Sequence, residues 1–230
     1  IYKAFEQTYF SNEIFPLESK HADEIISAHC MFETIQYPNN KIEINRTIRF
    51  ATPPTNDSQK IKELIHEINH SVNSSISPIC KRNNLLVFRN GISIHSLDEL
   101  YSEAVSLEEA INEEQTIEIF DIINTFKNYD IKNETLKNEI YKIKKSDTII
   151  GYRNLVLDIN PLYMNKEFNY VLKNKRLTGD LREIREHFNN KVGRSSAFQE
   201  LAKEMDNFEK TRNTTIQQSI RNKVYEYVRK

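Results

Sequence analysis

Two histidines and a glutamate stand close together in the segment His66-Glu67-Ile68-Asn69-His70. On a helix, residues four apart share one face, about 6 Å apart along the axis, so both imidazoles can reach a single metal ion. Zinc suits this pair because it binds histidine nitrogen at roughly 2.0–2.1 Å. Glu67 is turned about 100° from His66, which places it as a base for a water molecule rather than as a ligand. The pattern therefore predicts zinc-assisted hydrolysis.

The sequence around this motif is typical of an amphipathic helix. Residues that favour an N-cap occupy 55–58, and apolar residues then recur at intervals of three and four. These apolar positions are Ile61, Leu64, Ile65, Ile68 and Val72. Ser74 and Pro78 end the pattern. The histidines fall on the flank of the apolar stripe. The alternative is a chance motif whose histidines lie on an exposed helix face.

A catalytic zinc ion also needs a third protein ligand and one open coordination position. The extended motif H-E-x-x-H-x-x-G-x-x-H is excluded, because Asn73 and Ile76 occupy the positions of its glycine and third histidine. The third ligand is therefore expected downstream, at His95 or within an acidic stretch. That stretch comprises Asp98, Glu99, Glu103, Glu108, Glu109, Glu113 and Glu114. Its alternative interpretation is a solvated helix face.

The segment Leu107-Glu-Glu-Ala-Ile-Asn-Glu113 resembles the second motif of gluzincin metallopeptidases. That group joins H-E-x-x-H on one helix to a ligand glutamate on a later helix. The ligand usually precedes a small residue, as Glu109 precedes Ala110, and an acid one turn later often supports a ligand histidine. The resemblance therefore implies that Glu109 is the third ligand and that Glu113 orients an imidazole. Glu103, which precedes Ala104, is the alternative ligand.

The resemblance covers about residues 40–125, and the connector 88–93 looks like that of bacterial members. It departs from the family in spacing, because 38 residues (71 to 108) separate His70 from Glu109. Thermolysin-like and aminopeptidase-like members have a much shorter gap, so the subfamily is unassigned. The resemblance implies a metallopeptidase that acts on a peptide or protein. The alternatives are a zinc-binding regulatory or interaction module without peptidase activity, and a helical interaction protein with an accidental motif.

Two further expectations concern the substrate. Relatives often supply a Tyr or His from a second lobe to stabilise the oxyanion, and Tyr152, Tyr163 and His187 are candidates. We select Tyr152, which follows Gly151, by analogy alone. Residues 41–50 alternate between apolar and polar, which predicts a strand, although Arg46 interrupts the apolar face. In zincins such a strand often lies at a sheet edge and pairs with substrate, whereas an ordinary core strand fits the pattern equally.

These elements predict an α+β, zincin-like fold. A lobe over residues 1–80 carries a small antiparallel sheet and the active-site helix, and a helical lobe over 81–230 completes one catalytic domain. Leu85 to Phe88 predicts a strand closed by a turn at Asn90-Gly91. Helices are expected over 106–128, capped by Ser106, and over 152–159, ended by Pro161. Further helices are expected at 136–143, 168–172, 181–188, 198–208 and 216–228.

The composition limits the possible binding partners and locations of the protein. The 230 residues include 32 basic and 33 acidic side chains, mixed along the chain, so nothing indicates binding to nucleic acid. No run of 18 apolar residues predicts a membrane span. We interpret Cys30 and Cys80 as buried thiols, with a single bridge as the alternative. The chain begins at Ile1, which suggests trimming, so a secreted protein stays open beside the expected cytoplasmic location. The oligomeric state is not predicted.

Overall fold

The computed structural model describes residues 8–11, 28–38, 42–50, 57–78, 86–96, 101–125, 153–178 and 181–230. The helix expected at 136–143 lies outside these ranges. The chain forms two compact units, one of residues 1–72 with 115–151 and the other of 73–114 with 152–230. The predicted lobes, 1–80 and 81–230, were each continuous. The two compact units are discontinuous in the sequence. The first part of helix α3 (Val105–Thr125) belongs to the second unit, and its last part belongs to the first unit.

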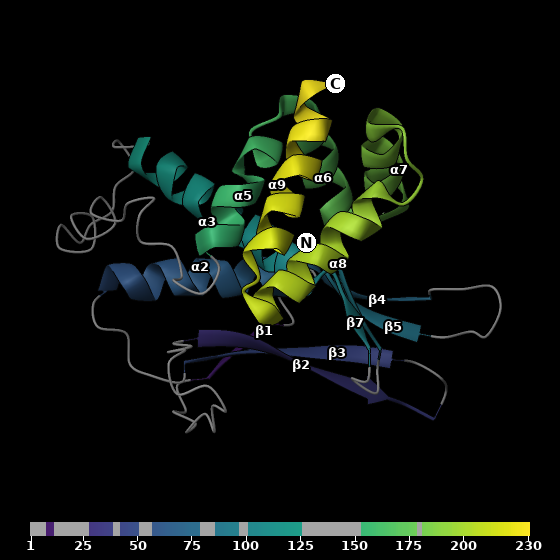
Figure 1. The fold of residues 1–230 in the computed structure, drawn as a ribbon. Helices are drawn as coiled ribbons and strands as arrows, with labels where there is room; N and C mark the ends of the chain where they lie inside the picture. The colour runs from purple at the N-terminus through teal and green to yellow at the C-terminus, as the bar shows by residue number, and fades with distance from the viewer. Residues whose placement is uncertain are drawn as a thin grey trace. The chain divides into compact units, whose positions relative to one another are not determined.

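The first unit contains a three-stranded sheet (Figure 1). Its strands are β1 (Thr8–Ser11), β2 (Ala28–Gln36) and β3 (Ile42–Phe50). The strand predicted over 41–50 is therefore confirmed. Its suggested place at a sheet edge is wrong, because β3 pairs with β1 on one side and with β2 on the other. The sheet is mixed rather than antiparallel, since β1 runs parallel to β3.

Helix α2 (Asp57–Asn73) carries the histidine motif, as predicted. Its polar face is more deeply buried than its apolar stripe. His66 and His70 are 2% and 5% exposed, whereas Leu64 and Ile65 are only half-buried. This burial excludes the alternative in which both histidines lie on a solvated helix face. Burying imidazoles is costly unless they gain hydrogen bonds or a metal ion, so the polar face of α2 points to a functional role.

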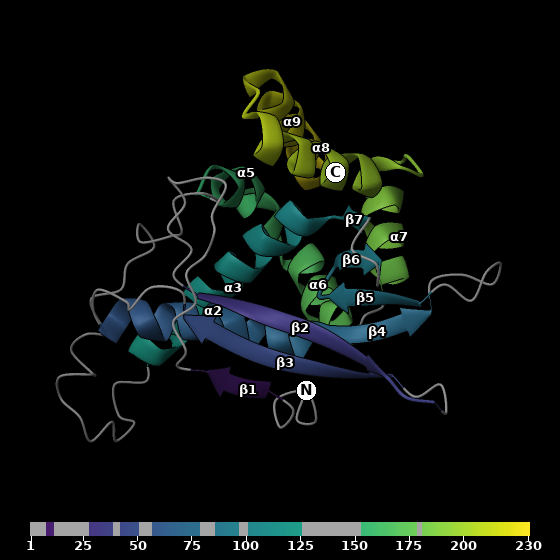
Figure 2. The same ribbon diagram turned by 90° about the horizontal axis from the view of Figure 1, so that it is seen from below.

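The second unit contains a four-stranded antiparallel sheet, which can be followed in Figure 2. In order, its strands are β4 (Ser74–Pro78), β5 (Leu86–Asn90), β6 (Ser93–Ser96) and β7 (Ser102–Glu103). The predicted strand and turn are confirmed at β5 and Gly91, whose φ of +57° suits glycine. The segment 74–78, expected only to end the preceding helix, forms β4 directly after α2.

Helix α3 confirms the long helix expected near 106–128, but its start differs. Val105 is already helical, so Ser106 is not the cap. Instead, the two carboxylate oxygens of Asp206 accept hydrogen bonds from the backbone N–H groups of Ala104 and Ser106, each at 2.8 Å. A carboxylate at this position satisfies unpaired N–H groups and complements the helix dipole. The first turn of α3 is therefore held by a residue from a distant part of the chain.

The remaining described helices confirm the helical C-terminal region. They are α5 (Arg153–Tyr163), α6 (Lys166–Thr178), α7 (Leu181–Val192), α8 (Ala197–Thr211) and α9 (Thr214–Arg229). Pro161 was expected to end α5 but lies inside it. Proline removes its own N–H donor, and its ring crowds the carbonyl group one turn earlier, but both effects are confined to the last turn of α5.

One hydrophobic core joins these helices to the rest of the second unit. Phe168, Phe188 and Tyr227 stack or meet edge to face at its centre. Ile92 of β6 and Leu107 of α3 belong to the same buried cluster. The helices and small sheets thus confirm an α+β fold. None of the described helices is both long enough and apolar enough to cross a bilayer.

Candidate metal centre

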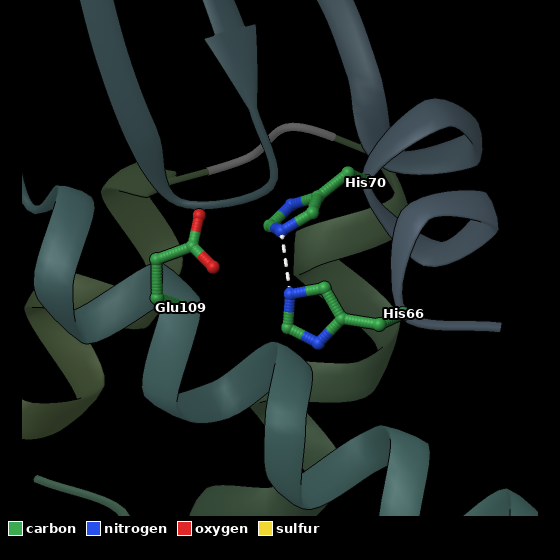
Figure 3. A group of neighbouring side chains, drawn as sticks. All are labelled: His66, His70 and Glu109. Atoms are coloured by element: carbon green, nitrogen blue, oxygen red, sulfur yellow. Dashed lines mark hydrogen bonds between the residues drawn. The ribbon is translucent and has the colours of Figure 1, made fainter. Parts of the chain in front are cut away.

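The two motif histidines converge on one point. Their Nε2 atoms lie 3.1 Å apart, and the rings meet edge to face at an angle of 76° with centroids 4.8 Å apart (Figure 3). Zinc–nitrogen bonds of about 2.0–2.1 Å at a tetrahedral angle hold two ligand nitrogens roughly 3.4 Å apart. The spacing of the two Nε2 atoms is close to that value. One helical turn of α2 therefore places two imidazole nitrogens at a spacing suited to one metal ion.

Glu109 completes the group. One nitrogen from each histidine and one carboxylate oxygen of Glu109 all lie within 4.8 Å of one another. In Figure 3 the carboxylate of Glu109, on α3, points toward the two imidazoles. Two nitrogens and one carboxylate oxygen form a donor set that zinc accepts in catalytic sites. The three side chains predicted as ligands from the sequence thus form a cluster that could hold a metal ion.

The other candidate ligands that the structure describes have different partners. The phenol of Tyr101 donates to Glu103 at 2.5 Å. That hydrogen bond is the main reason why the pKa of Tyr101 rises to about 12. The Nε2 atom of His95 lies 3.0 Å from the hydroxyl of Ser93, on the same strand. Asp98 and Glu99 lie outside the described residues. Glu109 rather than Glu103 therefore accompanies the histidines.

Two of the buried acids near Glu109 on α3, Glu108 and Glu114, form contacts with other side chains. Glu108 forms an ion pair with Arg176, and Glu114 accepts a hydrogen bond from Asn160 at 2.7 Å. Glu113, one turn after Glu109, is completely buried. Such burial is typical of a carboxylate that holds another polar group in place. The predicted role of Glu113 in orienting an imidazole stays a prediction.

Cys30 lies within electrostatic reach of Glu67, a proximity that the sequence did not reveal. Burial raises the pKa of the Cys30 thiol, the negative charge of Glu67 raises it further, and the charge of Arg46 opposes both. Cys30, on β2, is a free, half-buried thiol. Arg46 is buried on β3, and its Nε atom donates to the backbone oxygen of Ser71 at 3.2 Å. Glu67 and Arg46 therefore both act on the Cys30 thiol, with opposite signs, and the raised pKa keeps that thiol neutral.

Arg46 is a site-supporting residue that sequence reasoning missed. It was interpreted only as an interruption of the apolar face of its strand. Its guanidinium instead binds the last turn of α2, directly after His70, where helix carbonyl groups lack internal partners. A cation at a helix C-terminus is also favoured by the helix dipole. The available signal was a lone arginine within a buried strand, a residue type that is rarely buried without a partner.

The expected oxyanion donor is not located by the structure. Tyr152, the selected candidate, lies outside the described residues. Tyr163 is 5% exposed and belongs to the hydrophobic core. The Nε2 atom of His187 lies 2.8 Å from the hydroxyl of Tyr227, which links α7 to α9. Both of these alternatives thus have structural contacts of their own.

Comparison of the chain with protein-family models, with curated proteins and with solved structures finds no match. The resemblance to gluzincins therefore depends on the motif residues and on the clustering of their side chains. The geometry supports a metal site, and the choice of metal and reaction is a proposal.

Proposed function

We propose that this chain is a zinc-dependent metallopeptidase of the gluzincin kind. The observation that carries the proposal is the cluster of His66, His70 and Glu109, with Glu67 one residue after the first histidine. Two imidazoles and one carboxylate would hold the ion and leave a position for water. When bound, zinc would act as a Lewis acid and lower the pKa of water in that position.

Glu67 has the chemistry needed for proton transfer. Its carboxylate would accept a proton from the attacking water and then donate that proton to the leaving nitrogen of the peptide. The residue lies on the same rigid helix as both histidines, so its position relative to them is set by helix geometry. General acid–base catalysis of this kind typically contributes about 10²–10⁴-fold to the rate. The proposed ligands and the proposed base are therefore different residues, which separate variants can distinguish.

The proposal is tested with Glu67→Gln and His70→Ala. Glu67→Gln should bind stoichiometric zinc, measured by mass spectrometry of the purified protein, and should lose at least about a hundredfold of hydrolysis. His70→Ala should lose both zinc and hydrolysis, because one of three ligands is gone. The substrate probe is a library of internally quenched fluorescent peptides. Full activity of Glu67→Gln would overturn the mechanism.

A second outcome separates the activity from the metal site. If the unaltered chain holds stoichiometric zinc but cleaves no peptide of the library, the peptidase proposal fails. A zinc-binding module without peptidase activity then becomes the better description. If the chain holds no zinc even after reconstitution, the metal site itself is wrong.

A further inference from the structure

A buried ion pair lies one residue away from the proposed third ligand. Glu108 of α3 and Arg176 of α6 are 1% and 2% exposed. The Nε atom of Arg176 donates to both carboxylate oxygens of Glu108, at 3.0 and 3.1 Å, and Nη2 also contacts this carboxylate. Nη2 donates in addition to Oδ1 of Asn112 at 2.9 Å. The guanidinium thus binds two residues of α3 that are one turn apart.

The hairpin between β5 and β6 binds the same carboxylate. The backbone N–H of Ile92 donates to Oε2 of Glu108 at 2.9 Å. Gly91 lies so close to Glu108 that a Cβ atom at this position would overlap the carboxylate. Glu108 is therefore fixed from two sides, by a helix and by a backbone turn. Such a fixed side chain limits both the rotation and the sliding of α3.

The spacing along α3 connects this network with the metal site. Glu108 and Asn112 are four residues apart, and so are Glu109 and Glu113. Glu109 directly follows Glu108, and Glu113 directly follows Asn112. One residue corresponds to a turn of about 100° around the helix axis. Holding the first pair in one orientation consequently fixes the direction of the second. A rotation of α3 that moved Glu109 would break the hydrogen bonds of Arg176.

Stability alone does not explain a buried ion pair here. Replacing such a pair by apolar side chains is often neutral or stabilising, because desolvation offsets the attraction between the charges. Directional hydrogen bonds, in contrast, fix one geometry where apolar contacts would tolerate several. Hydrogen-bond partners that orient metal ligands typically change metal affinity by about 10–100-fold when they are removed.

We propose that Arg176 is a positioning residue for the metal site, which holds Glu109 in its ligand direction through Glu108 and Asn112. This role depends on the zinc site proposed above. It assigns a function in metal binding to helix α6, a part of the chain outside both metal-binding motifs. The expected effect of losing Arg176 is a weaker affinity for zinc in a protein that is still folded.

The decisive variant is the double substitution Glu108→Leu with Arg176→Met, which removes both charges together. Zinc affinity is measured by competition with a chromogenic chelator, and folding by the thermal midpoint of the full chain in excess chelator. We expect the double variant to stay folded with a lower thermal midpoint, because the buried N–H of Ile92 and the side chain of Asn112 each lose a hydrogen bond, and to lose zinc affinity roughly 10–100-fold. The control is Asp158→Leu with Arg221→Met, an ion pair between the buried Asp158 and the exposed Arg221 that joins α5 to α9. It should leave zinc affinity unchanged.

Asn112→Ala provides a second variant that keeps the ion pair, for the case in which the double variant does not fold. It removes one of the two contacts on α3 and should weaken zinc binding several-fold. Unchanged zinc affinity in the folded double variant, or in Asn112→Ala, would overturn the role of Arg176 while the metal site stands. An equal loss in the control pair would overturn it as well. Absence of zinc from the unaltered chain would overturn the metal site, and the role of Arg176 with it.

Discussion

Glu108 and Glu109 are adjacent in the sequence, yet their surroundings differ in kind. Glu108 is 1% exposed and lies against an arginine and a backbone N–H group. Glu109 is half-buried, and its carboxylate lies beside two imidazoles. A carboxylate bound to a guanidinium has its oxygen lone pairs directed at that cation. The two residues therefore have separate tasks, one structural and one suited to a metal ligand.

The choice of third ligand leads to a prediction at Glu109. Glu109→Gln replaces a carboxylate by a neutral amide and should lower zinc affinity by more than the roughly 10–100-fold typical of an outer hydrogen-bond partner. Glu103→Gln is the control, because Glu103 accepts its hydrogen bond from Tyr101 and stands apart from the cluster. It should bind zinc like the unaltered chain. Isothermal titration with zinc distinguishes the two, and a larger loss at Glu103 would reverse the assignment.

Local patterns explain which site residues could be predicted. His66, Glu67 and His70 belong to one helical turn, so their spacing alone indicated how they would meet. Glu109 required a resemblance to a known family, because nothing local links it with α2. The partners of Arg46 and Arg176 could not be predicted, since they lie 25 and 68 residues away in the chain. Contacts of that separation depend on the whole fold.

At the scale of elements, periodicity predicted the helices better than the short strands. Helices α2 and α5 to α9 repeat apolar residues every three or four positions, a signal contained within each segment, whereas the repeat of α3 is interrupted between Ile111 and Ile117. Strands β4, β6 and β7 have two to five residues and many serines, so only their neighbours in the sheet make them strands. The edge position suggested for β3 was wrong for the same reason. The sequence of a strand does not indicate which other strands will pair with it.

The start of α3 gives the prediction that belongs to this scale. Asp206→Ala removes the acceptor for the N–H groups of Ala104 and Ser106 and should lower the free energy of unfolding by about 1–2 kcal/mol. Asn213→Ala is the control, because Asn213 caps α9 from within its own chain segment, accepting from Thr215 at 2.8 Å. Urea denaturation in excess chelator measures both.

Both substitutions should destabilise the protein, but only Asp206→Ala should also weaken zinc binding, because α3 carries Glu109. If Asp206→Ala unfolds at the same urea concentration as the unaltered chain, the carboxylate does not hold the helix. If both variants bind zinc equally well, the start of α3 does not influence the ligand.

At the scale of the whole molecule, the hydrophobic core of the second unit also holds the part of α3 that carries Glu109. This core contains Leu107 and Ala110, which lie on either side of the proposed ligand Glu109 in α3, together with aromatic residues of α6, α7 and α9. Substitutions in that core should therefore shift α3 and weaken zinc binding at the proposed metal site. The sequence predicted these helices and their apolar residues, but it did not indicate that α3 would share a core with them.

Metal binding should accordingly stabilise the folded chain as a whole. Because folding brings the three proposed ligands together, zinc should bind the folded state in preference to the unfolded state. A free zinc concentration about a hundredfold above the dissociation constant should raise the free energy of unfolding by roughly 2.7 kcal/mol. For a chain of 230 residues this corresponds to a rise of about 5–10 °C in the thermal midpoint.

Differential scanning calorimetry with zinc, and then with excess chelator, measures this rise and its reversal. His66→Ala with His70→Ala is the control, because it removes the two ligands of α2 and should abolish the rise. A gain of similar size in this variant would mean that zinc stabilises the chain at another site. No gain in the unaltered chain would mean that the cluster of His66, His70 and Glu109 binds zinc too weakly to serve as a catalytic centre.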